Sequence, residues 1–276
     1  MAELLEARAN ARRAALLQWT GDAPTDRYVA RMDGREVPVL LFADGLTLEP
    51  HDAPPTHVPL SLVQAVERDG YAITLRVRAG EDVVVRGLGR RTDELLMDLD
   101  AARAALAAAT AAAYRGLSGE LAGLSAPDGW AIGPDEAGDR WDALRRAVHA
   151  AAPEALDHLA SLARSEVRYG IKRQAGGAVL PFCLARAGDR VAVEGAGEEG
   201  RATYVFRCPD VDRLNLALLA VSFRREALYL PAGRLGRWRL AVRTLEVVRW
   251  ARDALVARVP HDGAWADKVA AAMAGG

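Results

Sequence analysis

The chain has 276 residues, of which 51% are hydrophobic and 26% charged, and its formal net charge is -1 at pH 7. This apolar content excludes general disorder, and the length suits two cores of modest size. The near-zero charge excludes a long-range attraction to nucleic acid or anionic lipid. Any such binding must therefore come from a local patch.

Cysteine and lysine usage indicates the compartment and the source. Cys183 and Cys208 are the only cysteines, too few for a disulfide framework or a four-thiolate zinc site. Only Lys172 and Lys268 are lysines and alanine is abundant, a usage typical of a GC-rich bacterial genome. No stretch approaches the roughly 20 apolar residues of a membrane helix. We therefore expect a cytoplasmic bacterial protein that does not span a membrane.

The N-terminal third begins with a predicted amphipathic helix over residues 3–19, which ends at Gly21 and Pro24. Short apolar segments follow, separated by turn signals such as Asp33-Gly34 and Asp44-Gly45. The predicted strands are 28–32, 37–42, 46–48, 58–60, 71–78 and 83–86. In the strand 71–78 every second residue is apolar, and Tyr71, Ile73, Leu75 and Val77 share one face. That alternation predicts a half-buried antiparallel strand.

A long helix is predicted directly after these strands. Thr92 stands at a helix N-cap position, and Asp93 and Glu94 follow where the helix dipole favours acidic residues. Apolar residues then recur at steps of three and four between Leu95 and Leu106. This helix is expected to close the first unit.

The predicted elements are a series of strands that ends in one helix. Within this series the stretch 58–63 precedes the central hairpin, and the stretch 87–91 leads into the helix. In this order of elements residues 27–115 resemble the bacterial pleckstrin-homology-like (PH-like) domain. The resemblance implies an antiparallel β barrel closed by its C-terminal helix. It also implies a scaffold for binding lipid headgroups, peptides or proteins, without catalytic residues.

Residues 116–138 are rich in Gly, Pro and Ser, which predicts a linker. The expected division is therefore an N-terminal helix plus PH-like domain at 1–115, a linker at 116–138, and a second α+β domain at 139–276.

The second domain is predicted to combine a short antiparallel meander with long helices. Its expected helices lie around 141–148, from Pro153, from Pro209-Asp210 and over 235–259, and its expected strands are 179–185, 190–194, 202–207 and 227–230. Whether this domain is a second PH-like barrel stays open at this point.

The sequence offers several catalytic patterns, each with a simpler interpretation. The segment 195–200 matches G-x-G-x-x-G, but a strand follows it in place of a helix, so it is interpreted as a hairpin turn. The five histidines show no ligand spacing, and Asp189 with Glu194 is interpreted as a turn residue with a solvent-facing one. Cys183 lies in an apolar strand, typical of an inert thiol. We therefore predict no enzyme, no cofactor and no metal site.

The predicted binding surface lies on the last long helix and just before it. A helical projection places Arg239, Arg243 and Trp250 opposite the apolar face. Between residues 224 and 258 nine arginines face three acidic residues, a local charge of +6. Exposed Trp with Arg is enriched at interface hot spots. The candidate binding residues are Phe223, Arg224, Arg225, Arg239, Arg243 and Trp250.

The sequence thus favours a non-catalytic binding or adaptor protein that acts through protein–protein contacts. One alternative is a nucleic-acid-associated accessory protein that uses the same arginines. A second is a hydrolase whose site no motif reveals. A further open alternative is that Trp250 is covered within the fold, because large aromatic side chains are buried on average. The oligomeric state stays undetermined.

Overall fold

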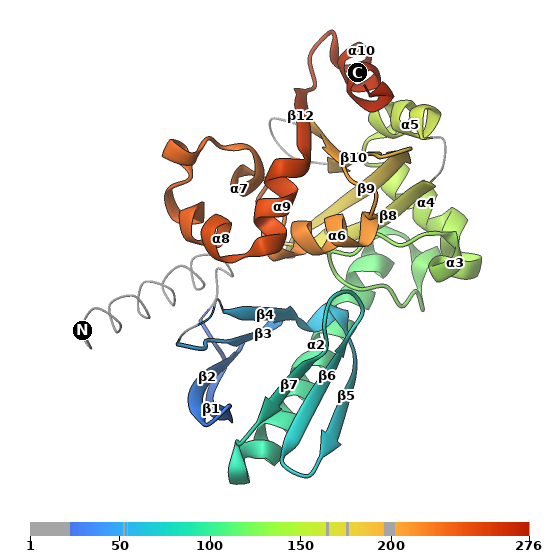
Figure 1. Cartoon of the computed structure of the whole chain (residues 1–276). Coiled ribbons are helices and arrows are strands. Elements are labelled where there is room, and N and C mark those ends of the chain that lie inside the picture. Colours follow the sequence, from blue (N-terminus) through green and yellow to red (C-terminus); the bar gives the residue numbers. More distant parts are fainter. Residues whose placement is uncertain are drawn as a thin grey trace.

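The computed structural model describes residues 23–51, 53, 55–163, 166–174, 177–195 and 202–275. Within these residues the strands form three sheets, and every strand pairing is antiparallel (Figure 1). The α+β character expected from the sequence is therefore confirmed. The predicted helix at 3–19 lies outside the described residues.

The first two sheets come from the N-terminal third, and their orders are β1-β2-β3-β4 and β5-β6-β7. The strands are β1 (Asp26–Met32), β2 (Arg35–Leu41), β3 (Gly45–Leu48), β4 (Thr56–Pro59), β5 (Val63–Asp69), β6 (Ala72–Val77) and β7 (Val83–Arg86). The strand β5 was not predicted. Ile73 and Leu75 are buried as expected, whereas Tyr71 precedes β6 and is 67% exposed. The buried face of this strand thus begins at Ile73, two residues later than predicted, because Tyr71 belongs to the turn between β5 and β6.

The long helix α2 (Thr92–Leu117) packs on these sheets with Leu95, Leu99 and Leu106 buried. Thr92 is its first residue and not its cap, because a 3-10 turn at Gly89–Arg91 precedes it. The Thr92 hydroxyl donates to the Gly89 carbonyl at 2.8 Å. The N-terminal strands and most of this helix enclose a first core. The last turns of the helix leave it, and Tyr114 is buried in a second core, formed mainly by residues after 120, which we call the second half of the molecule. This helix therefore joins the two halves of the molecule.

The Gly- and Pro-rich segment 116–138 packs against the second half of the molecule. Trp130 and Ile132 are almost fully buried. The Asn215 side chain accepts from the Ala131 amide and donates to its carbonyl, both at 3.1 Å. A short helix, α3 (Pro134–Ala137), ends the segment. Gly and Pro residues here serve turns within a packed segment, and the predicted division into domains remains a prediction.

The third sheet has the order β12-β11-β10-β9-β8. Its strands are β8 (Glu166–Arg173), β9 (Val179–Ala187), β10 (Arg190–Gly195), β11 (Ala202–Arg207) and β12 (Leu255–Pro260). The helices α4 (Trp141–His149), α5 (Pro153–Leu162) and α10 (Trp265–Ala274) contact this sheet, and α5 contacts both of the others. The helix α6 (Val211–Ala220) packs on α9 (Glu246–Ala254). The predicted meander corresponds to the three central strands of this sheet. The two edge strands, β8 and β12, were not predicted.

The single long helix predicted at 235–259 is wrong. The chain instead forms α8 (Arg239–Thr244), α9 and then β12. Leu245 has extended angles, φ -97 and ψ 109, and it interrupts the helix. Residues from Leu255 onward pair with β11, so backbone pairing in the sheet overrides their helical pattern. The projection that grouped Leu255 and Val259 with one helix face does not apply.

The strand predicted at 227–230 is also wrong, because α7 (Glu226–Tyr229) is a helical turn. Its end is held from α9, where the Arg252 guanidinium donates to the carbonyls of Ala227 and Leu230 at 2.6 and 2.8 Å. This contact from a distant helix stabilises a conformation that the local apolar run does not indicate.

Candidate functional site

The predicted binding residues fall on α8, on α9 and in the turn that precedes α7. These three helices contact one another, and α9 also packs on α6. Figure 1 shows them as one cluster on the left of the second half of the molecule. Three of the predicted residues, Arg224, Arg239 and Arg243, are exposed on this cluster.

Two predicted binding residues are buried, which corrects their placement on the surface. Phe223 is 6% exposed and packs edge-on against Phe182, with ring centroids 4.6 Å apart. Arg225 is also 6% exposed, and its guanidinium lies 5.0 Å from the centre of the Tyr204 ring. Both side chains therefore belong to the core of the second half.

Trp250 is partly buried on α9, between the two alternatives that the sequence left open. It packs against the core cluster, and the Arg213 guanidinium of α6 lies 4.6 Å from the centre of its ring. The same guanidinium lies 3.4 Å from the Glu246 carboxylate. Trp250 is thus a packing residue that is partly exposed. The sequence pattern could not show Arg213, because it lies on another helix.

Five exposed arginines remain on the cluster, and we call them the arginine surface: Arg224, Arg234, Arg239, Arg243 and Arg249. In the described part of the chain no acidic side chain forms an ion pair with any of them. Arg76 behaves differently, because Glu67 and Asp82 both pair with it. An exposed guanidinium without an internal partner is free to bind an external carboxylate or phosphate bidentately.

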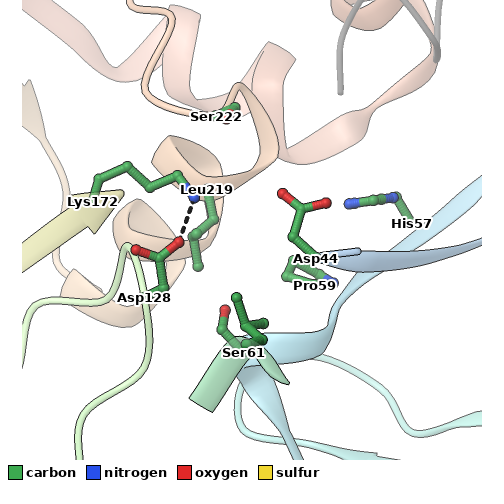
Figure 2. Close-up of a pocket in the computed structure, with 9 residues that line it drawn as sticks. Asp44, His57, Pro59, Ser61, Asp128, Lys172, Leu219 and Ser222 are labelled. Carbon is green, nitrogen blue, oxygen red and sulfur yellow. Dashed lines mark hydrogen bonds and ion pairs between the residues drawn. The ribbon is translucent and has the colours of Figure 1, made fainter. Parts of the chain in front are cut away.

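A small cavity lies where the two halves of the molecule meet, and its volume is about 20 Å³. Its wall includes Asp44, His57, Pro59 and Ser61 from the first half, Leu106 from α2, and Asp128, Lys172, Leu219 and Ser222 from the second half (Figure 2). The Lys172 ammonium donates to the Asp128 carboxylate at 2.6 Å, and Asp128 also accepts from the Arg173 amide at 2.7 Å. Both charged side chains are nearly buried, so each charge is stabilised by the opposite charge beside it.

Ser222 reaches this cavity from a strained turn at the end of α6. Ser222 and Phe223 have φ values of 46 and 59, which non-glycine residues adopt only at a cost. The Ser222 and Phe223 amides donate to the carbonyls of Leu219 and Leu218 at 2.7 and 2.8 Å, as in a Schellman cap. The turn directs Phe223 into the core and closes the helix, which is a structural reason for the strain.

His57 lies on the opposite wall of the cavity. Its Nδ1 is 2.8 Å from the Thr47 hydroxyl, and its ring fills the space beside Gly45. Burial disfavours the charged ring and lowers the pKa of His57 to about 4, so the side chain is neutral at pH 7. The cavity has room for about one water molecule.

The remaining candidates from the sequence have structural roles. Glu194, interpreted as solvent-facing, is 1% exposed, which corrects that interpretation. The strand β11 follows the glycine motif as expected, although residues 196–201 lie outside the described part. Cys183 is buried in the sheet, and desolvation raises the pKa of its thiol, as expected of an unreactive cysteine.

Within the residues described, three or more His, Cys, Asp or Glu side chains never gather in a way that could hold a metal ion. No described helix combines the length and apolar character needed to cross a bilayer. Comparison with known proteins finds no match to a protein-family model, a curated protein or a solved structure. The arginine surface is therefore the candidate site that the chain itself supports best.

Proposed function

We propose that this chain is a non-catalytic binding or adaptor protein of the bacterial cytoplasm, which acts through protein–protein contacts. Its N-terminal half is a PH-like barrel that serves as scaffold, and its second half presents the arginine surface to the partner. The observation that carries the proposal is that these five exposed arginines have no acidic partner within the described chain. No cofactor takes part in it.

The arginine surface suits a partner that carries a run of carboxylates. Like charges gathered on adjacent helices repel one another weakly in water, and an acidic segment would relieve that repulsion. Trp250, partly exposed on the neighbouring helix α9, would add an apolar contact of the kind found at hot spots. Nucleic acid is the alternative partner, because phosphate also accepts bidentate hydrogen bonds from arginine.

A charge-reversal experiment tests the proposal. The tagged chain, its Arg239→Glu/Arg243→Glu variant and a control would each be used to capture proteins from a bacterial lysate. The control is Arg90→Glu/Arg115→Glu, which reverses two exposed arginines away from the cluster. We expect a partner protein to be captured by the wild type and the control, and lost from the first variant. Equal capture by all three would contradict the proposal.

Titration with duplex and single-stranded DNA at two salt concentrations separates the alternatives. Phosphate binding weakens steeply as salt rises. DNA affinity that falls with salt, and that disappears in the Arg239→Glu/Arg243→Glu variant alone, would assign the arginine surface to nucleic acid.

A further inference from the structure

An open groove lies at one end of the first core, and its volume is about 860 Å³. Three connections line it: the turn between β1 and β2, the loop between β3 and β4, and the turn between β6 and β7. Leu216 of α6 also lines it. A volume of this order is typical of binding sites in proteins.

Much of the lining of the groove is apolar. Val37, Leu48 and Val58 belong to the first core, and Met32 and Val83 pack against that core while remaining partly exposed. A ligand that covers these side chains removes apolar surface from water, which favours binding. The groove therefore suits a ligand that carries apolar groups.

Acidic side chains outnumber basic ones along the groove. Among the described residues that line it, the acidic ones are Asp33, Glu36, Glu81 and Asp82, and the basic one is Arg35. Glu36 and Asp82 have arginine partners. Asp33 and Glu81 are exposed and form no ion pair in the described part of the chain. An anionic ligand such as a lipid headgroup would be repelled, so the groove suits a ligand that is both apolar and basic.

The sequence contains a segment of this chemistry just before the described residues. Residues 7–19 include Arg8, Arg12 and Arg13 and no acidic residue, and their apolar side chains include Leu16, Leu17 and Trp19. We propose that residues 7–19 occupy the groove of the same chain. Their apolar side chains cover its apolar lining, and Arg12 and Arg13 lie beside Asp33 and Glu81.

The length of the chain allows this placement. The described chain begins at Ala23, three residues before β1, and Met32 at the other end of β1 lines the groove. The seven residues of β1 extend over roughly 20 Å. Residues 7–19 would span about 20 Å as a helix and more when extended, and residues 20–22 add up to about 10 Å. The segment can therefore return along the sheet and reach the groove.

This inference goes beyond the proposed function, because it concerns another part of the molecule. The arginine surface takes no part in it, so it stands if the proposed function fails. While residues 7–19 are bound, the groove is closed to other ligands.

Photo-cross-linking on the full chain tests the inference. Cys183 and Cys208 are both buried, so Ala14→Cys can be labelled selectively with a benzophenone reagent. We expect cross-links within one chain to the turns at 32–36 and 79–84, identified by mass spectrometry. Cross-links to other surfaces, cross-links only between two chains, or none at all would overturn the inference.

Hydrogen exchange of residues 7–19 tests whether the two unpaired carboxylates hold the segment. Asp33→Asn/Glu81→Gln removes both charges, and asparagine tolerates the positive φ of 51 at residue 33. We expect the amides of residues 7–19 to exchange about fivefold faster in this variant. The matched control is Asp69→Asn/Glu154→Gln, which neutralises two exposed carboxylates away from the groove and should leave the exchange unchanged. Equal exchange in both variants would overturn the inference.

A double-mutant cycle shows whether the two sets of charges meet. Arg12→Gln/Arg13→Gln should speed exchange of the same segment by about fivefold, and combining it with Asp33→Asn/Glu81→Gln should add little, because both variants remove the same contacts. Effects that multiply in the combined variant would show that the two sets of charges act independently, which would refute the pairing. If a variant does not fold, the cross-links of the otherwise unchanged chain still decide.

Discussion

The arginine surface and the Asp128–Lys172 cluster place charge in opposite environments. The five arginines are exposed and form no ion pair within the described residues, whereas Asp128 and Lys172 are nearly buried and 2.6 Å apart. Solvated charges contribute little to folding, and buried paired charges are expensive to separate. We therefore expect substitutions in the arginine surface to change binding, and substitutions of Asp128 or Lys172 to change stability.

The largest effect is expected for Asp128→Ala. The change leaves the Lys172 ammonium and the Arg173 amide without their acceptor in a buried site. We expect the free energy of unfolding to fall by about 3–5 kcal/mol, measured by urea denaturation. The control is Asp262→Ala, which breaks the exposed pair with Lys268 and should have a small effect. Equal losses in both variants would contradict the distinction between buried and solvated charge.

Acid should destabilise the folded chain through His57. Its pKa is about 4 in the folded chain and 6.5 when exposed, so the unfolded chain binds the proton more tightly. The stabilisation is therefore complete above pH 6.5 and is lost as the pH falls towards 4, by at most about 3 kcal/mol. Urea midpoints of the wild type and His57→Asn from pH 7 to 4 should show this slope in the wild type alone. Parallel curves would mean that His57 titrates normally.

Trp250→Ala should have an intermediate effect, because the ring is only partly buried between the core and Arg213. We expect a loss of about 2 kcal/mol of unfolding free energy, below the cost of truncating a fully buried aromatic residue. Tyr71→Ala is the control, since that ring is 67% exposed. If Trp250→Ala lost no more unfolding free energy than the control, Trp250 would behave as a surface residue, and its role as a binding anchor would be favoured.

The smallest effect is expected for Arg239→Ala/Arg243→Ala. Both side chains are exposed and have no ion pair in the described chain, so the unfolding free energy should change by less than about 0.5 kcal/mol. Thermal and urea denaturation of the double variant measure this directly. A larger loss would reveal an internal partner and would remove these residues from the arginine surface.

Local patterns predicted the strands of the first half well, and the reason is visible in the turns. Asp33 and Gly34 have the positive φ values that a tight hairpin needs, and the strands on either side pair as β1 and β2. The strands β9 to β11 follow the same logic of alternation and turn. The strand β5 was missed because its polar residues, such as Gln64 and Glu67, interrupt the apolar pattern.

The candidate site was predicted less well, because burial depends on contacts between distant segments. Arg239 and Arg243 are exposed as expected, but Phe223 is turned inward by the strained end of α6. Arg225 packs on Tyr204 of β11. Neither contact leaves a periodic signal in the sequence. Lys172 carried a signal that was available, since it is one of only two lysines, although its partner Asp128 lies 44 residues away.

The sequence alone determined the composition limits, the α+β class, the position of most strands and the local excess of arginine, because each depends on residue type and short-range periodicity. Only the tertiary structure decided that residues 255–260 are a strand, since pairing with β11 outweighs a helical pattern. It likewise decided which arginines stay exposed and that Glu194 is buried. Burial and partnering are properties of surfaces that meet in three dimensions, and no local pattern encodes them.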